Sequence, residues 1–215
     1  MKTKLILTFS FLTFSLLSFG QVGLLGSYPF NGNANDVSGN GNNGVVTGAT
    51  LTTDRFGNPN TAFKFDGIND YIDLGTGINY TSHSISVWIK LDSIPANNFY
   101  SIISGLNDNL YSFTNTEMRV YTNAKPEYIL GNSTNYGGVQ NISNTIVLDT
   151  ILWKNLVVTY NNSTGKIIMF LNSQRIDSSI TPFSQSVNSS QYIGAVHIGR
   201  GQVVQLSFLK VQLMK

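Results

Sequence analysis

Short runs of β-branched and aromatic residues recur along the chain, separated by clusters of Gly, Asn, Ser and Asp. Such runs are typical of β-strands joined by tight turns. Beyond the first twenty residues, no stretch has apolar residues at i, i+3, i+4 and i+7, the spacing of an amphipathic helix. The pattern therefore predicts an all-β, antiparallel sandwich or barrel. We expect strands at residues 24–30, 62–67, 71–75, 84–91, 100–105, 110–114, 117–122, 145–149, 153–160, 166–173 and 195–199.

The run "SISVWIKL" at residues 84–91 shows which face of a strand is buried. Alternate side chains of a strand point to opposite faces of its sheet. One face is apolar and is predicted to lie in the core; it carries Ile85, Val87, Ile89 and Leu91. The opposite face carries Ser86, Trp88 and Lys90, a mixture that indicates a partly covered or ligand-facing surface.

The first twenty residues are predicted to be a secretory signal, which leaves 21–215 as one domain. Lys2 and Lys4 precede an apolar run that ends at Ser18-Phe19-Gly20, where small residues suit a signal peptidase. The run is shorter than the ~20 residues of a membrane span, so we expect no transmembrane segment after cleavage. We therefore expect the protein to be secreted or held at the cell surface.

Charge and cysteine content limit the classes of binding partner and indicate the kind of organism from which the protein comes. The formal net charge is +2, only 11% of residues are charged, and the chain contains no cysteine. No basic stripe is present, so nucleic acid is not expected as a partner. A secreted domain without disulfides favours an exported bacterial protein.

The order of several motifs resembles one family. "YPFNGNANDVSGNGNNG" is followed by "AFKFDGINDYIDL", "HSISVWIKL", "WKNLVVTYNNSTGKIIMFLNSQRI" and "VHIGRG". In this order and spacing, the motifs resemble the laminin-G-like, concanavalin A-like jelly rolls of exported bacterial proteins, from Leu24 to Gly201. The resemblance implies two packed antiparallel sheets, one concave and one convex. The superfamily includes lectins, pentraxins, laminin modules and glucanases, so the resemblance alone does not select a function.

The end of the chain departs from the family pattern from about residue 202. The tail "QVVQLSFLKVQLMK" has no acidic residue, whereas the family's last strand usually carries acids. Leu206 and Phe208 alternate in one phase and Leu209, Val211 and Leu213 in the other, so a regular strand would point them to opposite faces. A bulge between the two sets would resolve this. We favour the alternative, that the usual last strand is lost and the tail replaces it loosely, with rapid amide exchange.

No catalytic constellation is evident. Glycoside hydrolysis needs two carboxyl groups facing each other across the scissile bond. The chain has only two glutamates, Glu117 and Glu127, and Glu117 is followed on its own strand face by Arg119, not by a second acid. His83 and His197 have no nearby Ser or Cys in a recognisable nucleophile context and are interpreted as sheet-surface or core-edge residues. The protein is therefore predicted not to be an enzyme.

A structural calcium is the one cofactor that the loops suggest. The loop "NGNANDVSGNGNNG" offers Asn33 and Asp36, and the turn "FDGINDYIDL" offers Asp66, Asn69 and Asp70. Calcium prefers carboxylate, amide and carbonyl oxygens on flexible loops. Ordinary turn chemistry explains the same residues without a metal, because Asn, Asp and Gly dominate turns.

Aromatic side chains among Asn and Ser residues suggest a binding surface, since sugars stack on aromatic platforms beside a few polar groups. The candidates are Trp88, Tyr100, Tyr111, Tyr121, Tyr128 and Tyr136. The stretch "EYILGNSTNYGGVQN" has no clear strand pattern and is interpreted as a long loop that carries recognition. The sequence thus predicts a secreted, non-catalytic binding or adhesion module for a carbohydrate or an extracellular protein partner. The alternatives are a glucanase-type hydrolase and a purely structural envelope module.

Overall fold

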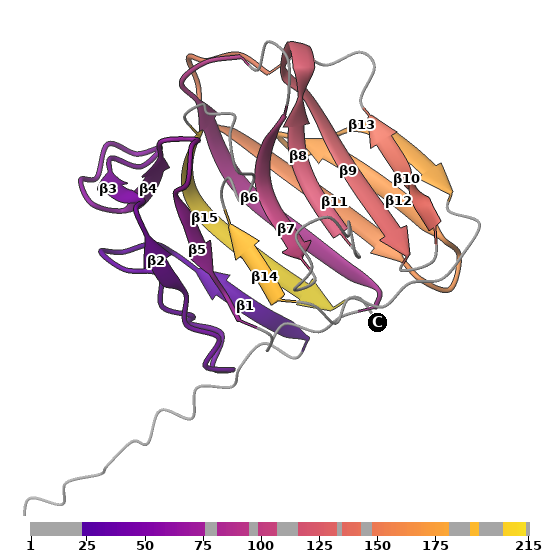
Figure 1. Cartoon of the computed structure of the whole chain (residues 1–215), viewed down its shortest axis with the longest axis horizontal. Helices are drawn as coiled ribbons and strands as arrows, with labels where there is room; N and C mark the ends of the chain where they lie inside the picture. The colour runs from indigo at the N-terminus through magenta and orange to yellow at the C-terminus, as the bar shows by residue number, and fades with distance from the viewer. Residues whose placement is uncertain are drawn as a thin grey trace, which may run out of the picture.

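The computed structural model describes residues 23–75, 81–94, 99–106, 116–132, 135–142, 148–180, 190–193 and 204–213. Two antiparallel sheets form the fold, as predicted (Figure 1). The first sheet consists of β1 (Leu24–Tyr28), β3 (Thr50–Thr52), β4 (Ala62–Phe65), β6 (His83–Leu91), β11 (Lys154–Asn161), β12 (Lys166–Leu171), β13 (Gln174–Ile180) and β15 (Val204–Leu213). The second sheet consists of β2 (Val45–Thr47), β5 (Tyr71–Asp73), β7 (Tyr100–Leu106), β8 (Thr116–Tyr121), β9 (Lys125–Asn132), β10 (Asn135–Ile142) and β14 (Ser190–Ile193). A 3-10 turn, η1 (Thr122–Ala124), joins β8 to β9.

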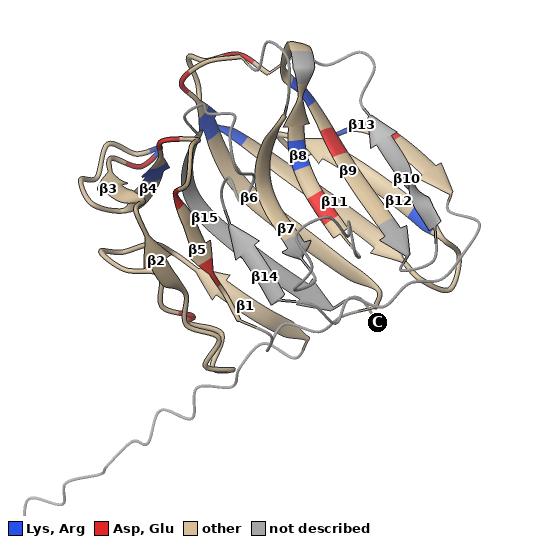
Figure 2. Cartoon of the chain, in the orientation of Figure 1, with Lys and Arg blue, Asp and Glu red and all other residues tan. Residues whose placement is uncertain are grey.

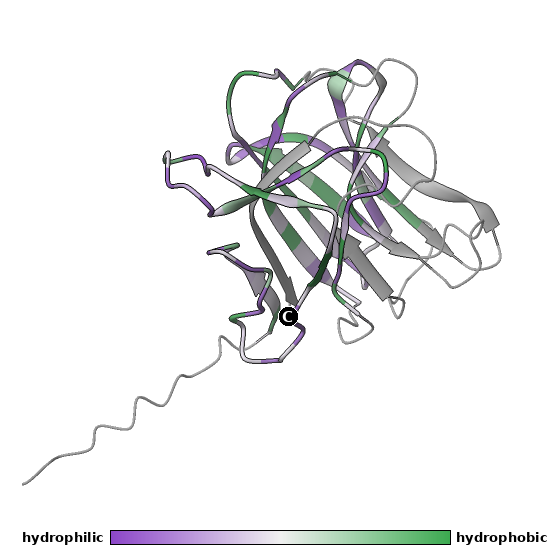
Figure 3. Ribbon diagram, turned by 60° about the vertical axis from the view of Figure 1, so that its left-hand side comes forward, coloured by the Kyte–Doolittle hydropathy of each residue, from purple (hydrophilic) through white to green (hydrophobic). Residues whose placement is uncertain are grey.

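The core lies between the two sheets. In β6 every second residue is buried, including the predicted set from Ile85 to Leu91, and the residues between them are partly exposed. The same alternation appears as green and purple segments along the strands in Figure 3. The largest fully buried side chains include Tyr28, Tyr128, Tyr160 and Phe65. Burial of such rings contributes most of the hydrophobic stabilisation of a sandwich.

Two hairpins of the first sheet turn at residues whose backbone conformations suit tight turns. β11 pairs with β12 around a turn that ends at Gly165, whose φ of 65° suits glycine. β12 pairs with β13 around Asn172 and Ser173, which both have positive φ. Positive φ at both central residues is the geometry that matches the twist of a two-residue hairpin.

The interpretation of residues 127–141 as a long loop is wrong. The segment forms β9 and β10, which pair in antiparallel register from Asn135–Asn132 to Ile142–Glu127. The register shifts between Asn135 and Val139, where Gly137 and Gly138 interrupt the alternation that identifies a strand. β10 is also an edge strand of its sheet, so only one side of its backbone is paired within that sheet.

The interpretation that the C-terminal tail only loosely replaces a lost strand is also wrong. β15 lies inside the first sheet, with β6 on one side and β4 and β1 on the other. Its register against β6 shifts between Leu206 and Phe208, the junction of the two alternation phases. The bulge that the sequence allowed is therefore present, and the tail is a ten-residue strand.

Candidate functional site

Strands β8 and β9 present two different faces. Met118 pairs with Tyr128, and both side chains are buried in the core. Arg119 pairs with Glu127, one residue along each strand, so these two side chains lie on the opposite, outer face of the second sheet. Glu117 shares that face because it is two residues from Arg119. Figure 2 shows acidic and basic residues together on these strands.

We call Glu117, Arg119 and Glu127 the charged cluster. The Nη1–H of Arg119 donates to Glu117 Oε2 at 3.1 Å, and the Nε–H of Arg119 donates to Glu127 Oε2. The three residues are only 5%, 6% and 1% exposed, respectively. The second carboxylate oxygen of Glu127 has no hydrogen-bond partner among the described residues. Charge-assisted bonds of this kind fix the position of the guanidinium closely.

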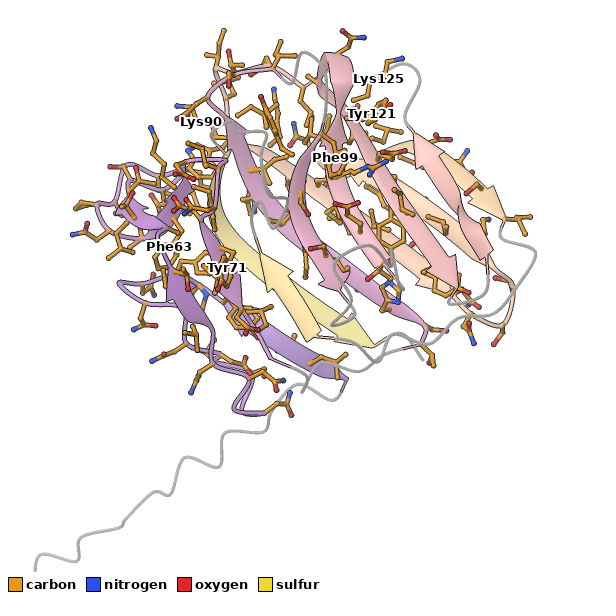
Figure 4. All side chains as sticks on the ribbon, viewed as in Figure 1. Phe63, Tyr71, Lys90, Phe99, Tyr121 and Lys125 are labelled. Atoms are coloured by element: carbon orange, nitrogen blue, oxygen red, sulfur yellow. The ribbon has the colours of Figure 1, made fainter. Side chains whose placement is uncertain are left out.

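Two aromatic rings lie against the guanidinium of Arg119. The guanidinium carbon is 4.1 Å from the centroid of Phe99 and 5.5 Å from that of Tyr121. Tyr121 is 37% exposed, and its cross-strand neighbour is Lys125. Figure 4 shows Phe99, Tyr121 and Lys125 together near the end of β8. We call Phe99, Arg119 and Tyr121 the aromatic platform.

The charged cluster carries an excess of negative charge, because one guanidinium faces two carboxylates. Burial raises the pKa of Glu117 to about 7, against the opposing influence of the Arg119 guanidinium and the Ser101 hydroxyl. The nearby charge of Glu127 acts in the same direction as burial. Near neutral pH the cluster thus holds a proton on Glu117 in part of the molecules.

Within β8, no second acidic residue shares the face of Glu117, as predicted, but the neighbouring strand does provide one. The β8–β9 hairpin places Glu127 on the same face, through a cross-strand pairing that the alternation along one strand cannot indicate. The guanidinium of Arg119 lies between the two carboxylates and binds both. A glycosidase instead keeps the space between its carboxyl groups for the scissile bond. The arrangement is therefore suited to holding Arg119 in place.

The predicted ligand-binding aromatics whose side chains the structure describes do not gather in one place. Trp88 lies on the outer face of the first sheet, with its ring 4.7 Å from the guanidinium carbon of Arg55. Tyr100 and Tyr128 are buried in the core between the sheets, where a ring offers no open surface to a sugar. Tyr136 is on the edge strand β10, and Tyr111 lies outside the described residues. The candidate Tyr121 lies in the aromatic platform, whereas Phe99, the other ring of that platform, was not predicted as a site residue.

His83 joins the two sheets. Its Nδ1 lies 2.7 Å from the carbonyl oxygen of Thr81, which can only accept, so Nδ1 carries the proton. Nε2 therefore accepts a hydrogen bond from the Tyr128 hydroxyl at 2.6 Å. Burial lowers the pKa of the His83 imidazole to about 4, although the Thr81 bond acts in the opposite direction. The imidazole is thus neutral, and its role is structural.

The Asn- and Gly-rich loop that precedes β2 is organised around Asp36. Asp36 Oδ1 accepts the backbone N–H groups of Ser27 and Ser38 at 2.9 and 2.8 Å. Asp36 Oδ2 accepts the Ser38 hydroxyl at 2.7 Å and the Asn42 N–H at 3.2 Å. Asn33 instead bonds within the loop, to the N–H of Asn35. Both oxygens of Asp36 thus face hydrogen-bond donors, which do not suit a cation.

The second calcium candidate is a tight turn between β4 and β5. Asp66 Oδ1 accepts the N–H groups of Ile68 and Asn69, and Asp70 Oδ2 accepts the N–H of Asp66. Gly48 packs so closely on Asp70 that a Cβ there would be 1.9 Å from Oδ1. Within the described ranges, no group of three or more His, Cys, Asp or Glu residues gathers as a metal site. Calcium therefore stays a prediction.

Replacing Asp36 tests the role of the Asn- and Gly-rich loop that precedes β2. We expect Asp36→Asn to destabilise the fold by about 2 kcal/mol, because an amide cannot accept all four bonds. Urea unfolding measures the change, with Asp177→Asn on β13 as the matched control. If calcium binds here, excess calcium will stabilise the unsubstituted protein and not Asp36→Asn. Stabilisation that survives the substitution would place the ion elsewhere, with Asp66 and Asp70 next in line.

A family model described as the concanavalin A-like lectin/glucanases superfamily matches residues 66–210. No curated protein matches the sequence. The described part of the chain contains no helix with the length and hydropathy of a membrane span.

Several solved structures share the fold. The receptor binding domain of botulinum neurotoxin type G has a TM-score of 0.65 at 17% identity, over 88% of this chain and 47% of that one. The binding domain of botulinum neurotoxin DC, in complex with rat synaptotagmin II, has a TM-score of 0.64 at 16% identity, over 89% and 48%. Domain 4 of an extracellular arabinanase from Geobacillus stearothermophilus, in complex with arabinotriose, has a TM-score of 0.56 at 20% identity, over 89% and 92%. This chain spans about half the length of the toxin domains, and at these identities the likeness is one of fold.

Proposed function

The chain belongs to the concanavalin A-like lectin/glucanases superfamily, and we propose that it is a secreted, non-catalytic module that binds a carbohydrate or an extracellular partner. The observation that carries the proposal is the aromatic platform on the outer face of the second sheet. Structural neighbours that are binding domains, one of them in complex with arabinotriose, support the same class of function. Export is supported by the signal-like first twenty residues and by the extracellular neighbour.

The platform has the features of a small sugar site. Tyr121 offers a partly exposed ring with a hydroxyl, and Lys125 lies beside it as a hydrogen-bond donor. Sugars bind by stacking their apolar face on a ring while nearby polar groups meet their hydroxyls. The charged cluster contributes rigidity, because Glu117 and Glu127 hold the guanidinium against which both rings pack. A platform fixed before binding loses little conformational entropy on binding.

A glycan array tests the proposal, with arabinotriose and a panel of neutral and acidic oligosaccharides, in the presence and absence of a calcium chelator. We expect a subset of saccharides to bind and Tyr121→Ala to weaken that binding at least about tenfold, a typical effect of losing a stacking ring. Ile180→Ala, which removes an exposed side chain on the opposite sheet, is the matched control. Equal binding by both variants would refute this location of the site.

Hydrolysis is the second candidate, because the two glutamates share one sheet face. The same saccharides are therefore analysed for cleavage after incubation with the protein. We expect them to stay intact, because Arg119 lies between the two carboxylates. Product release that disappears in Glu117→Gln would establish an enzyme in place of a binding module.

A further inference from the structure

The turn between β3 and β4 holds an exposed aromatic ring in a fixed position. Asp54 Oδ1 accepts the N–H groups of Phe56 and Asn58 at 2.8 and 2.9 Å. The side-chain amide of Asn58 donates to Asp54 Oδ2 at 3.1 Å, and the Thr61 hydroxyl donates to the Asn58 carbonyl at 2.8 Å. Despite this ordered backbone, the Phe56 ring is 72% exposed. The well-bonded turn therefore presents this large apolar side chain to solvent in a fixed place.

The exposed ring is part of a larger stack. The guanidinium carbon of Arg55 is 4.2 Å from the centroid of Phe56 and 4.7 Å from that of Trp88. These distances are typical of cation–π contacts. Trp88 is on the outer face of β6, so the stack continues from the turn onto the first sheet. One face of Phe56 is covered by Arg55, and the high exposure of the ring leaves the other face to solvent.

The surroundings of this Arg55 stack are positively charged on balance. Lys90 follows Trp88 on the same face of β6, and Lys64 is in the same cross-strand row, on the far side of Gln205. Lys64 is paired with Asp92 at 2.9 Å, and Asp54 accepts bonds from its own turn. The basic residues Arg55, Lys64 and Lys90 thus outnumber the two acidic residues near them, Asp54 and Asp92. Figures 2 and 4 show the basic residues at this end of β4 and β6, with Lys90 labelled.

We propose that the Arg55 stack is a second binding surface, separate from the aromatic platform, for the carboxylate-bearing ring of an acidic saccharide. The sugar ring stacks on the open face of Phe56, and its carboxylate is attracted by Arg55 and Lys90. The amide and hydroxyl groups of Asn58, Asn60 and Thr61 on the same turn match a ligand rich in hydroxyls. An acidic peptide would use the charge alone and leave the exposed ring without a partner.

Two saccharides that differ only in charge test the proposal: trigalacturonate and its full methyl ester. Binding is followed by NMR of the full chain, with the indole Nε1–H of Trp88 as the reporter. We expect trigalacturonate to shift this signal, and the methyl ester to bind about tenfold more weakly or not at all, a difference that salt reduces. Phe56→Ala and Arg55→Gln should each weaken binding about tenfold while the thermal midpoint stays unchanged. Tyr121→Ala, which disables only the aromatic platform, should leave the shift intact.

Four outcomes would overturn the inference. Equal binding of the acid and its ester would exclude charge recognition, and an unchanged Trp88 signal would exclude this surface. Equal binding of a penta-glutamate peptide would indicate an acidic peptide as the ligand. A shift abolished by Tyr121→Ala and not by Phe56→Ala would assign the acidic saccharide to the aromatic platform instead.

Discussion

A chain shortened to residue 203 is expected not to fold. The shortening removes β15, which bonds to β6 on one side and to β4 and β1 on the other. Those strands would then carry unpaired backbone groups in the middle of a sheet, which is costly when they are buried and aggregation-prone when they are exposed. The loss exceeds the 5–15 kcal/mol of net stability that is typical of a domain. Urea unfolding followed by circular dichroism should show no cooperative transition.

A chain ending at Leu213 is the matched control, because it retains the whole of β15. Amide exchange of the intact protein gives an independent measurement. We expect the amides of residues 206–213 to be protected as strongly as those of Val157–Tyr160 in β11. Rapid exchange of the tail, together with cooperative unfolding of the shortened chain, would show that β15 is dispensable and contradict this account of the fold.

The second large effect is the dependence of stability on pH. His83 has a pKa of about 4 in the fold against 6.5 when unfolded, so the unfolded chain binds the proton first as the pH falls. The contribution of His83 to the free energy of unfolding is therefore complete above pH 6.5 and is lost as the pH falls to 4. Glu117 behaves oppositely, because its pKa is raised from 4.5 to about 7. Its contribution is complete below pH 4.5 and is lost as the pH rises to 7.

Between pH 4.5 and 6.5, the pH dependence of stability due to His83 is opposite to that due to Glu117. The unsubstituted protein should therefore show nearly constant stability in this range. Glu117→Gln removes one slope, and its stability should fall by about 3 kcal/mol between pH 6.5 and 4, since one pKa unit corresponds to about 1.4 kcal/mol. His83→Asn removes the other, and its stability should decrease as the pH rises from 4.5 to 7. Urea unfolding across this range measures both. Parallel profiles for the two variants would show that neither group titrates as described.

Features set by neighbouring residues were predictable from the sequence. Alternation in β6 identified its buried face. The motif order indicated the superfamily, and the family match confirms it. The buried face of a strand is a local feature, because strand period depends on a few adjacent residues.

Features that depend on how strands pair with one another were not predictable. The two alternation phases in the tail are reconciled by a bulge against β6, more than a hundred residues away in the sequence. In β10, Asn and Gly residues interrupt the alternation by which a strand is recognised, and the strand forms by pairing with β9. The aromatic platform requires the register of β8 against β9 and the position of Phe99, and the alternation along β8 alone indicates neither.

The most direct test of the binding function is to locate a bound saccharide on the protein. The Nε–H of Arg119, held by Glu127 beneath Phe99, provides an NMR signal inside the platform. A neutral saccharide selected by the glycan array should shift this signal and the ring signals of Tyr121 in a saturable titration, while the saccharide stays uncleaved. Saturable binding that leaves both signals unchanged, or cleavage of the saccharide during the titration, would contradict the account.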